Sequence, residues 1–92
     1  MITKGQLILS EQECEGNYDF LGVRPFMTRG FKTIFGENSL DIAIAALLAI
    51  SERYNDNADY LQVFNYIQDG DSTKFYCIHS ETYITFLLPE EY

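Results

Sequence analysis

The sequence predicts an α+β fold in which one central apolar helix packs on an antiparallel sheet of about four strands. Residues 39–53 form an apolar run of helical length, and residues 60–88 alternate apolar and polar side chains as strands do. Turn residues bound both regions. We therefore expect the element order β-α-β-β-β, with one extra N-terminal strand as an alternative.

The length of 92 residues predicts a single domain, residues 1–92, with a core of modest size. Its first part, residues 1–23, is an acidic segment, and residues 24–92 hold the expected core. Within the acidic segment, residues 6–9 predict a short strand. Residues 10–19 are almost all polar and rich in acids, so they predict a solvated acidic loop.

A basic window follows at residues 20–35, which contain half of the bases and no acid. The residue before Pro25 is pushed toward extended backbone, so residues 24–29 predict an edge strand that Gly30 ends. The bases of this window are expected to neutralise the protein's own acids. The alternative is an anion site formed by Arg24, Arg29 and Lys32.

The central helix is predicted over residues 39–53, with Ser39 as its N-cap and Asp41 near the positive end of the helix dipole. It is expected to end at residues 54–57, whose polar side chains compete with helical hydrogen bonding. Apart from Asp41, every residue from 40 to 50 is apolar. A helix that is apolar on every side is expected to be buried on more than one side.

Residues 60–88 predict an antiparallel meander of three strands, with turns at residues 69–72 and near residues 80–81. Tight turns centred there define the register between the strands. On the face expected to form the core, Phe64 then lies opposite Cys77 and Ile84, and Tyr66 lies opposite Phe75 and Phe86.

The second face of this meander is also apolar and aromatic, and a sheet with two such faces needs a cover on each. One helix covers only one face. The remaining cover is expected from the N-terminal third of the chain or from another molecule, which predicts a homodimer or a partner interface. The residues of this expected interface are Leu61, Val63, Tyr76, Ile78 and Tyr83.

The charge balance indicates the class of partner. Fourteen acids against six bases give a formal net charge of −8, which disfavours direct binding to nucleic acid or to an anionic membrane. A basic protein partner suits this charge, and the alternative is that the acids serve solubility alone. The sequence shows neither a secretory leader nor an apolar run of membrane-spanning length, so we expect a cytoplasmic protein.

No catalytic, cofactor or metal site is predicted. Cys77 and His79 share one face of a strand, a spacing in which an imidazole can activate a thiol, but core packing is the expected role of Cys77. His79 is the single histidine, and a metal site needs several converging ligands. Residues 69–71 resemble the start of a calcium loop but lack its later ligands, so we interpret them as a hairpin turn.

Three short stretches resemble a family of small proteins from phages, plasmids and chromosomes of Gram-positive bacteria, a domain of unknown function. They are FMTRG at residues 26–30, DYLQVF at residues 59–64 and LLPEEY at residues 87–92. The chain departs from the family in its added segment, residues 1–23, and in a shorter connection after the DYLQVF stretch. The resemblance implies a mobile-element context, and with it the cytoplasm of a host cell, but no activity.

Two functions remain as hypotheses. The first is an inhibitor of the anti-CRISPR or anti-restriction type, whose carboxylates stand in for phosphates in the basic channel of a host nucleic-acid-binding defence protein. The second is a non-enzymatic adaptor or structural module that docks a partner through the aromatic sheet face. The carboxylates expected to bind the partner in the first hypothesis are Glu11, Glu13, Glu15, Asp19, Glu52, Asp56, Asp59, Asp69, Asp71 and Glu81.

Overall fold

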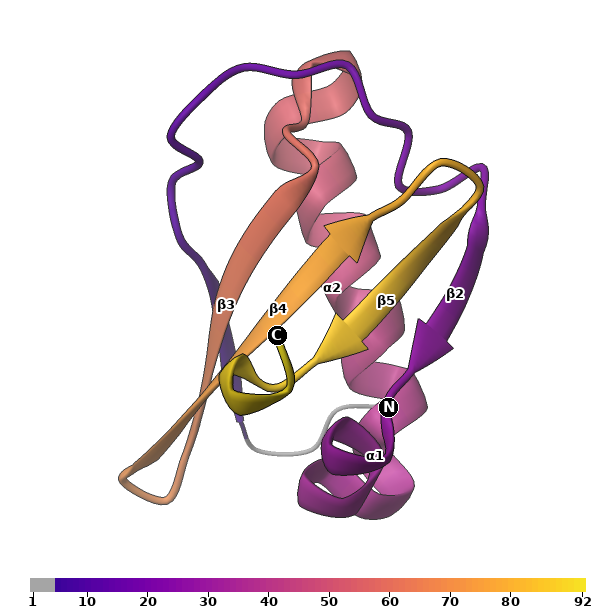
Figure 1. Ribbon diagram of the computed structural model, residues 1–92. Helices are drawn as coiled ribbons and strands as arrows, with labels where there is room; N and C mark the ends of the chain where they lie inside the picture. The colour runs from indigo at the N-terminus through magenta and orange to yellow at the C-terminus, as the bar shows by residue number, and fades with distance from the viewer. Residues whose placement is uncertain (1–4) are drawn as a thin grey trace.

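The computed structural model describes residues 5–92 and confirms the α+β class. Within these residues a five-stranded sheet has the order β1-β3-β4-β5-β2, and helices α1 and α2 cover one of its faces (Figure 1). The strands are β1 (Gln6–Leu9), β2 (Arg24–Met27), β3 (Leu61–Gln68), β4 (Asp71–His79) and β5 (Tyr83–Leu87). The helices are α1 (Arg29–Phe35) and α2 (Ser39–Tyr54), with 3-10 helices η1 (Gly36–Asn38), η2 (Asn55–Asn57) and η3 (Pro89–Glu91).

The extra N-terminal strand is present, and it completes one edge of the sheet. Strand β1 pairs antiparallel with β3, while β2 pairs parallel with β5 at the opposite edge. Pro25 has no backbone N–H, and its place in the edge strand β2 costs the sheet no interior hydrogen bond. The predicted antiparallel sheet is therefore antiparallel except at this edge.

The predicted register of the meander is wrong by two residues at both hairpins. Phe64 lies opposite Phe75, and Cys77 lies opposite Phe86. The first turn is centred on Asp69 and Gly70, whose φ angles of 54° and 84° are those of a type I′ turn. Because a shift of two residues leaves each side chain on the same face, the prediction of the core face is correct even though its pairs are not.

Helix α1 was not predicted, and it begins where Gly30 was expected only to end a strand. Thr28 caps it, since its hydroxyl oxygen accepts a hydrogen bond from the backbone N–H of Phe31 at 3.2 Å. Ser39, predicted as the N-cap of α2, is instead its first residue and is buried, and Asn38 occupies the cap position. The end of α2 falls in residues 54–57, as predicted.

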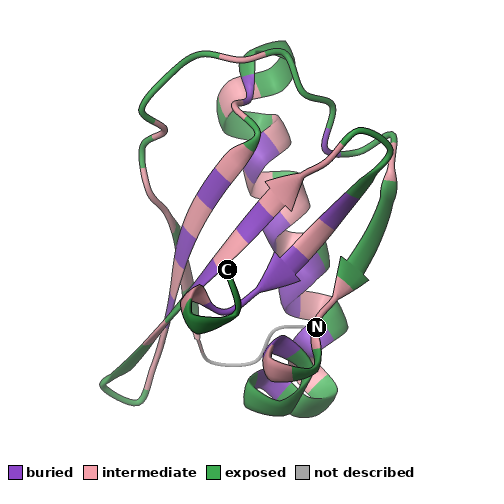
Figure 2. Cartoon of the chain, in the orientation of Figure 1, coloured by how far each residue is buried: buried purple, intermediate pink, exposed green. Residues whose placement is uncertain are grey.

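The core lies between the helices and the sheet and is dominated by phenylalanine rings. Phe75, at the centre of β4, stacks on Phe64 with ring centroids 5.1 Å apart and meets Phe31 of α1 edge-on, also at 5.1 Å. Helix α2 contributes small and large apolar residues to the same core, among them Ala43, Ala46 and Ile50, which are buried. Figure 2 shows this buried face of α2 turned toward the sheet.

The opposite side of α2 is left about half exposed by the residues that the structure describes. Leu40, Ile44 and Leu48 are 57%, 48% and 53% exposed. The prediction that this helix is buried on more than one side is therefore wrong for the single chain. The physical reason is the spacing of Leu40, Ile44 and Leu48. Residues four apart lie on one side of a helix, and here that side faces away from the sheet.

By length and hydropathy, the helical stretch Arg29–Asn57 could cross a membrane, although the core helix of a folded domain meets the same criteria. Gly36, with a positive φ of 56°, interrupts the stretch between α1 and α2. The 16 residues of α2 alone span about 24 Å, less than the roughly 30 Å of a bilayer core.

The outer face of the sheet is partly covered by the chain's own C-terminus. The expected cover was the N-terminal third or another molecule, but η3 lies over this face, opposite the helices (Figure 1). The ring of Tyr92 meets that of Tyr76 edge-on, with centroids 5.6 Å apart. The neighbouring Tyr92 also raises the pKa of Tyr60, through its charge and through a hydrogen bond between the two side chains.

One carboxylate fastens this C-terminal segment to the start of α1. The Oε1 atom of Glu91 accepts a hydrogen bond from the Thr28 hydroxyl at 2.6 Å and from the Leu88 N–H at 2.9 Å. Its Oε2 atom accepts the N–H of Gly30 at 3.1 Å. A Cβ atom at position 30 would lie 2.7 Å from this carboxyl group, so a larger residue there would displace the Glu91 side chain from its present position. We call this arrangement the Glu91 clamp.

The clamp gives the fold a defined dependence on pH. The hydrogen bond from Thr28, followed by that from Leu88, lowers the pKa of Glu91 below its ordinary value of 4.5. The clamp therefore stabilises the fold fully above pH 4.5, and this contribution is lost as the pH falls through the lowered pKa of the folded protein.

Replacing Glu91 with Gln is expected to lower the melting temperature near neutral pH, because the amide offers one acceptor oxygen where the carboxylate offers two charged ones. The difference from wild type should shrink as the pH falls below 4.5 and through the lowered pKa of Glu91, because the wild-type carboxyl then loses its charge as well. Thermal denaturation followed by circular dichroism measures both values. Glu90→Gln is the matched control, and an equal loss in that variant would contradict the clamp.

Candidate functional site

The acidic residues of the N-terminal segment belong to a fixed strap rather than to a freely solvated loop. We define the N-terminal strap as residues 10–22, which cross the end of α2 between β1 and β2 (Figure 1). Its backbone N–H groups bond outside the strap, from Ser10 to Val63 O at 2.9 Å, from Gly16 to Asn57 O at 3.1 Å and from Tyr18 to Ala58 O at 3.0 Å. The prediction of exposure is correct, but the backbone is held in place.

Gln12 is the centre of a hydrogen-bond network that fastens the strap to the core. Its backbone N–H donates to the Tyr54 hydroxyl at 2.9 Å, and its Nε2 atom donates to Asn57 O at 2.9 Å. Its Oε1 atom accepts from the Asp59 N–H at 2.8 Å and from Nε2 of the buried Gln62 at 2.9 Å. One polar side chain thus joins the strap to the end of α2 and to the start of β3.

Aromatic packing anchors the other end of the strap. Phe20 is buried and lies edge-on to His79, with ring centroids 5.3 Å apart, while Tyr18 packs on His79 at 5.0 Å. The Nε2 atom of His79 is hydrogen-bonded to the backbone oxygen of Asp19 at 3.1 Å. His79 therefore has a structural role at the strap.

Docking of the strap gathers acids at one end of the molecule, which we call the acidic end. The strap acids lie beside the last turn of α2, η2 and the first residues of β3 (Figure 1). The turn between β4 and β5 lies next to the last part of the strap, where the chain leads into β2. All of these acids are exposed except Asp59, which is half-buried. The acidic end comprises Glu11, Glu13, Glu15, Asp19, Glu52, Asp56, Asp59 and Glu81.

The structure does not bring the last two predicted acids, Asp69 and Asp71, to this end. They lie at the turn between β3 and β4, and β3 has eight residues, so about 27 Å of strand separates them from its acidic-end start. Both are exposed.

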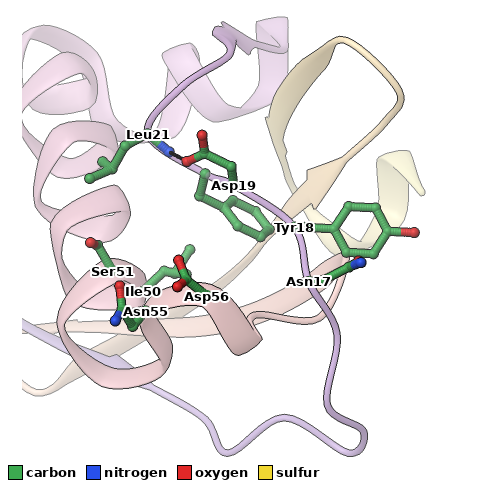
Figure 3. A pocket seen from close by; sticks show the side chains of 9 residues that line it. Asn17, Tyr18, Asp19, Leu21, Ile50, Ser51, Asn55 and Asp56 are labelled. Atoms are coloured by element: carbon green, nitrogen blue, oxygen red, sulfur yellow. Dashed lines mark hydrogen bonds between the residues drawn. The ribbon is translucent and has the colours of Figure 1, made fainter.

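A hollow of about 340 Å³ lies between the strap and the last turn of α2 (Figure 3). Asp19 and Asp56 contribute carboxylates to its lining. The Oδ1 atom of Asp19 also accepts the N–H groups of Leu21 at 3.0 Å and Gly22 at 3.1 Å, so this carboxylate shapes the strap as well. The polar part of the lining consists of acids, amides and Ser51, and the rest is apolar or aromatic, including Leu21 and Ile50. The two carboxylates suit a cationic side chain better than an anion.

Arg53 lies at the acidic end but faces the sheet. Its Nη1 atom donates to the backbone oxygen of Leu9 in β1 at 2.7 Å, and its guanidinium lies 5.4 Å from the ring centroid of Tyr54. These contacts direct the cation toward β1. The exposed charge at this end is therefore mainly negative.

The five predicted interface residues lie on the outer sheet face as expected, but most of them are half-buried. Tyr76 is partly covered by Tyr92, whereas Tyr83 is exposed and meets the exposed Phe26 edge-on at 5.6 Å. The remaining three, Leu61, Val63 and Ile78, are half-buried. Of the five predicted interface residues, only Tyr83 is therefore exposed, at the edge formed by β5 and β2.

Cys77 packs in the core, as predicted. It is fully buried, and desolvation raises the pKa of its thiol well above the ordinary value, which disfavours the nucleophilic thiolate. Among residues 5–92, no group of three or more His, Cys, Asp and Glu side chains is placed to hold a metal ion.

Comparison of the chain with protein-family models, curated proteins and solved structures finds no match. The resemblance to the mobile-element family therefore stays a prediction. In this chain the three stretches that carry it converge on the C-terminal segment, since Glu91 bonds to Thr28 and Gly30 while Tyr92 contacts Tyr60.

Replacing Gln12 with Ala is expected to loosen the strap and to cost about 1–3 kcal/mol, because the buried Gln62 amide loses a partner. Hydrogen exchange of the Gly16 and Tyr18 amides measures the loosening directly and should become faster. Gln6→Ala, at an exposed position of β1, is the control. Unchanged exchange at Gly16 and Tyr18 in the Gln12 variant would show that the strap is held by other contacts.

Proposed function

We propose that this chain is a non-enzymatic inhibitor whose acidic end occupies a basic, nucleic-acid-binding surface of another protein. The observation that carries the proposal is the docking of the N-terminal strap, which fixes four acids beside those of α2, η2 and the β4–β5 turn. The mobile-element resemblance, itself a prediction, favours a host defence nuclease as the target, of the CRISPR or restriction type.

The docked strap matters because binding a partner with a flexible acidic loop costs conformational entropy, and a strap already held by its backbone avoids most of that cost. Carboxylates on a fixed scaffold also keep a constant distance from one another, as the phosphates of a nucleic-acid backbone do. The negative field of the whole chain, with a net charge of −8, would accelerate encounter with a basic groove.

The uneven distribution of acids distinguishes this proposal from acidity that serves solubility alone. Solubility requires net charge anywhere on the surface, whereas phosphate mimicry requires the charge in one place. Eight of the fourteen acids lie at the acidic end. The other six are Glu37, Asp41, Asp69, Asp71, Glu90 and Glu91. The carboxylates at the acidic end repel one another, so this arrangement lowers the stability of the fold more than an even distribution of the same acids would.

The test is a cleavage assay on purified bacterial defence nucleases, with and without the chain. Inhibition should weaken by at least tenfold between about 50 and about 500 mM salt, because charge attraction is screened. The triple variant Glu11→Gln, Glu13→Gln, Glu15→Gln should inhibit at least tenfold less at low salt, since it removes three charges from the strap.

The matched control removes three charges elsewhere, with Asp69→Asn, Asp71→Asn and Glu90→Gln. Asparagine suits position 69, where the φ angle is positive. This control should inhibit nearly as well as wild type. Equal losses in the two triple variants, or inhibition that does not change with salt, would contradict mimicry at the acidic end.

A second candidate function, the adaptor, is favoured by one observation: Phe26 and Tyr83 form an exposed aromatic pair at the β2–β5 edge. Binding through this pair would survive high salt, because it depends on apolar contact. Tyr83→Asp should abolish such binding in a pull-down at about 500 mM salt, whereas the acid variants should not. Binding that Tyr83→Asp leaves intact would exclude this edge.

A further inference from the structure

The exposed side of α2 carries a continuous line of large apolar side chains. We define the α2 ridge as Leu40, Ile44 and Leu48, each about half exposed. Residues spaced by four form one ridge on a helix, and this ridge is about 12 Å long. Such a ridge fits the groove between two ridges of a second helix.

The ridge does not serve the core of this chain. The side of α2 that faces the sheet is formed by other residues, including Ile42, Ala46 and Ile50, which are 1% exposed or less. Polar residues at the ridge positions would leave those contacts intact and would lower the apolar surface exposed to water. The ridge is therefore the kind of surface that a partner covers.

The charges around the ridge indicate what the partner carries. Asp41 and Glu52 lie about 60° and 80° from Ile44 around the helix axis, on the same side, and Glu37 precedes the ridge in η1. The one base of α2, Arg53, points to the opposite side and bonds to β1. The ridge thus has an acidic border.

We propose that the α2 ridge docks an amphipathic helix of a partner protein, whose apolar stripe is flanked by lysine or arginine. The apolar stripe would cover Leu40, Ile44 and Leu48, and the flanking cations would face Asp41 and Glu52. This inference goes beyond the proposed function, because it concerns a second surface, which shares only Glu52 with the acidic end, and because it depends on apolar burial.

A second copy of the chain fits the ridge less well. In a two-fold antiparallel pair centred on Ile44, each Leu40 would meet the other copy's Leu48, which satisfies the apolar contacts. The same symmetry places the side with Asp41 and Glu52 next to its own copy, so acids face acids. Each copy also carries a net charge of −8. An anionic membrane is disfavoured by the same charges.

The experiment uses a fluorescently labelled synthetic helical peptide with leucine at every fourth position and lysine beside each leucine. Its affinity for the full chain is measured by anisotropy at low and at high salt. A second peptide has glutamate in place of every lysine. The lysine peptide should bind at least tenfold more tightly than the glutamate peptide at low salt, and part of its affinity should persist at high salt.

Two variants test the ridge itself. Ile44→Ser, and separately the pair Leu40→Ala with Leu48→Ala, should each weaken peptide binding at least tenfold, with melting temperatures close to that of wild type. The alanine pair retains helix propensity and keeps the test valid if serine unfolds the helix. Leu21→Ser is the matched control, since Leu21 is equally exposed but lies on the strap. It should bind as wild type does.

Other outcomes would overturn the proposal. Full peptide binding by both ridge variants, or equal affinity for the two peptides, would exclude a basic helix at this surface. Loss of binding only in the Glu11, Glu13 and Glu15 variant would place the peptide at the acidic end, and the proposed function would survive. A dimer in light scattering that Ile44→Ser dissociates would assign the ridge to a second copy. Ridge-dependent binding to phosphatidylglycerol vesicles would assign it to a membrane.

Discussion

The packing of both helices against one face of the sheet is the constraint on which the rest of this structure depends. Phe64 and Phe75 of the sheet and Phe31 of α1 fill the space between the layers. A single helical layer leaves the other face of the sheet to a different cover, and here η3 and Tyr92 provide it. Because the Glu91 clamp joins this cover to the first turn of α1, the two layers are also connected to each other.

The strap shows how an acidic segment can be ordered despite its own repulsion. Its acids are exposed and its anchors are not acidic, since Gln12 supplies hydrogen bonds and Phe20 supplies apolar burial. The anchors lie between and beyond the acids, so Glu11, Glu13 and Glu15 stay exposed while the backbone is held. Asp19 differs, because its carboxylate accepts two backbone N–H groups of the strap. Local repulsion at the acidic end is thereby offset mainly by contacts of uncharged groups.

The faces of the sheet could be predicted from the sequence because side chains alternate with a period of two, and an error of two residues in a turn does not change a face. The start of α1 could not be predicted, because a glycine after an extended segment usually marks the end of a strand. Here the N–H of Gly30 lies in the first turn of a helix and donates to Glu91, which is 61 residues away in the sequence. The candidate acids could be identified by residue type alone. Their gathering at one end could not, because it depends on Gln12 bonding to Tyr54, 42 residues away.

The error about α2 has a physical reason in how its apolar residues are distributed. The side toward the sheet carries Ile42, Ala43, Ala46 and Ile50, which are buried. Leu40, Ile44 and Leu48 are also apolar, but they face water. Composition predicts an apolar helix but not which of its sides is buried, since every side is apolar. Because the buried side of α2 already holds Ile42 and Ile50 as well as its alanines, the core of the chain does not need the ridge, and the ridge remains an apolar surface in water.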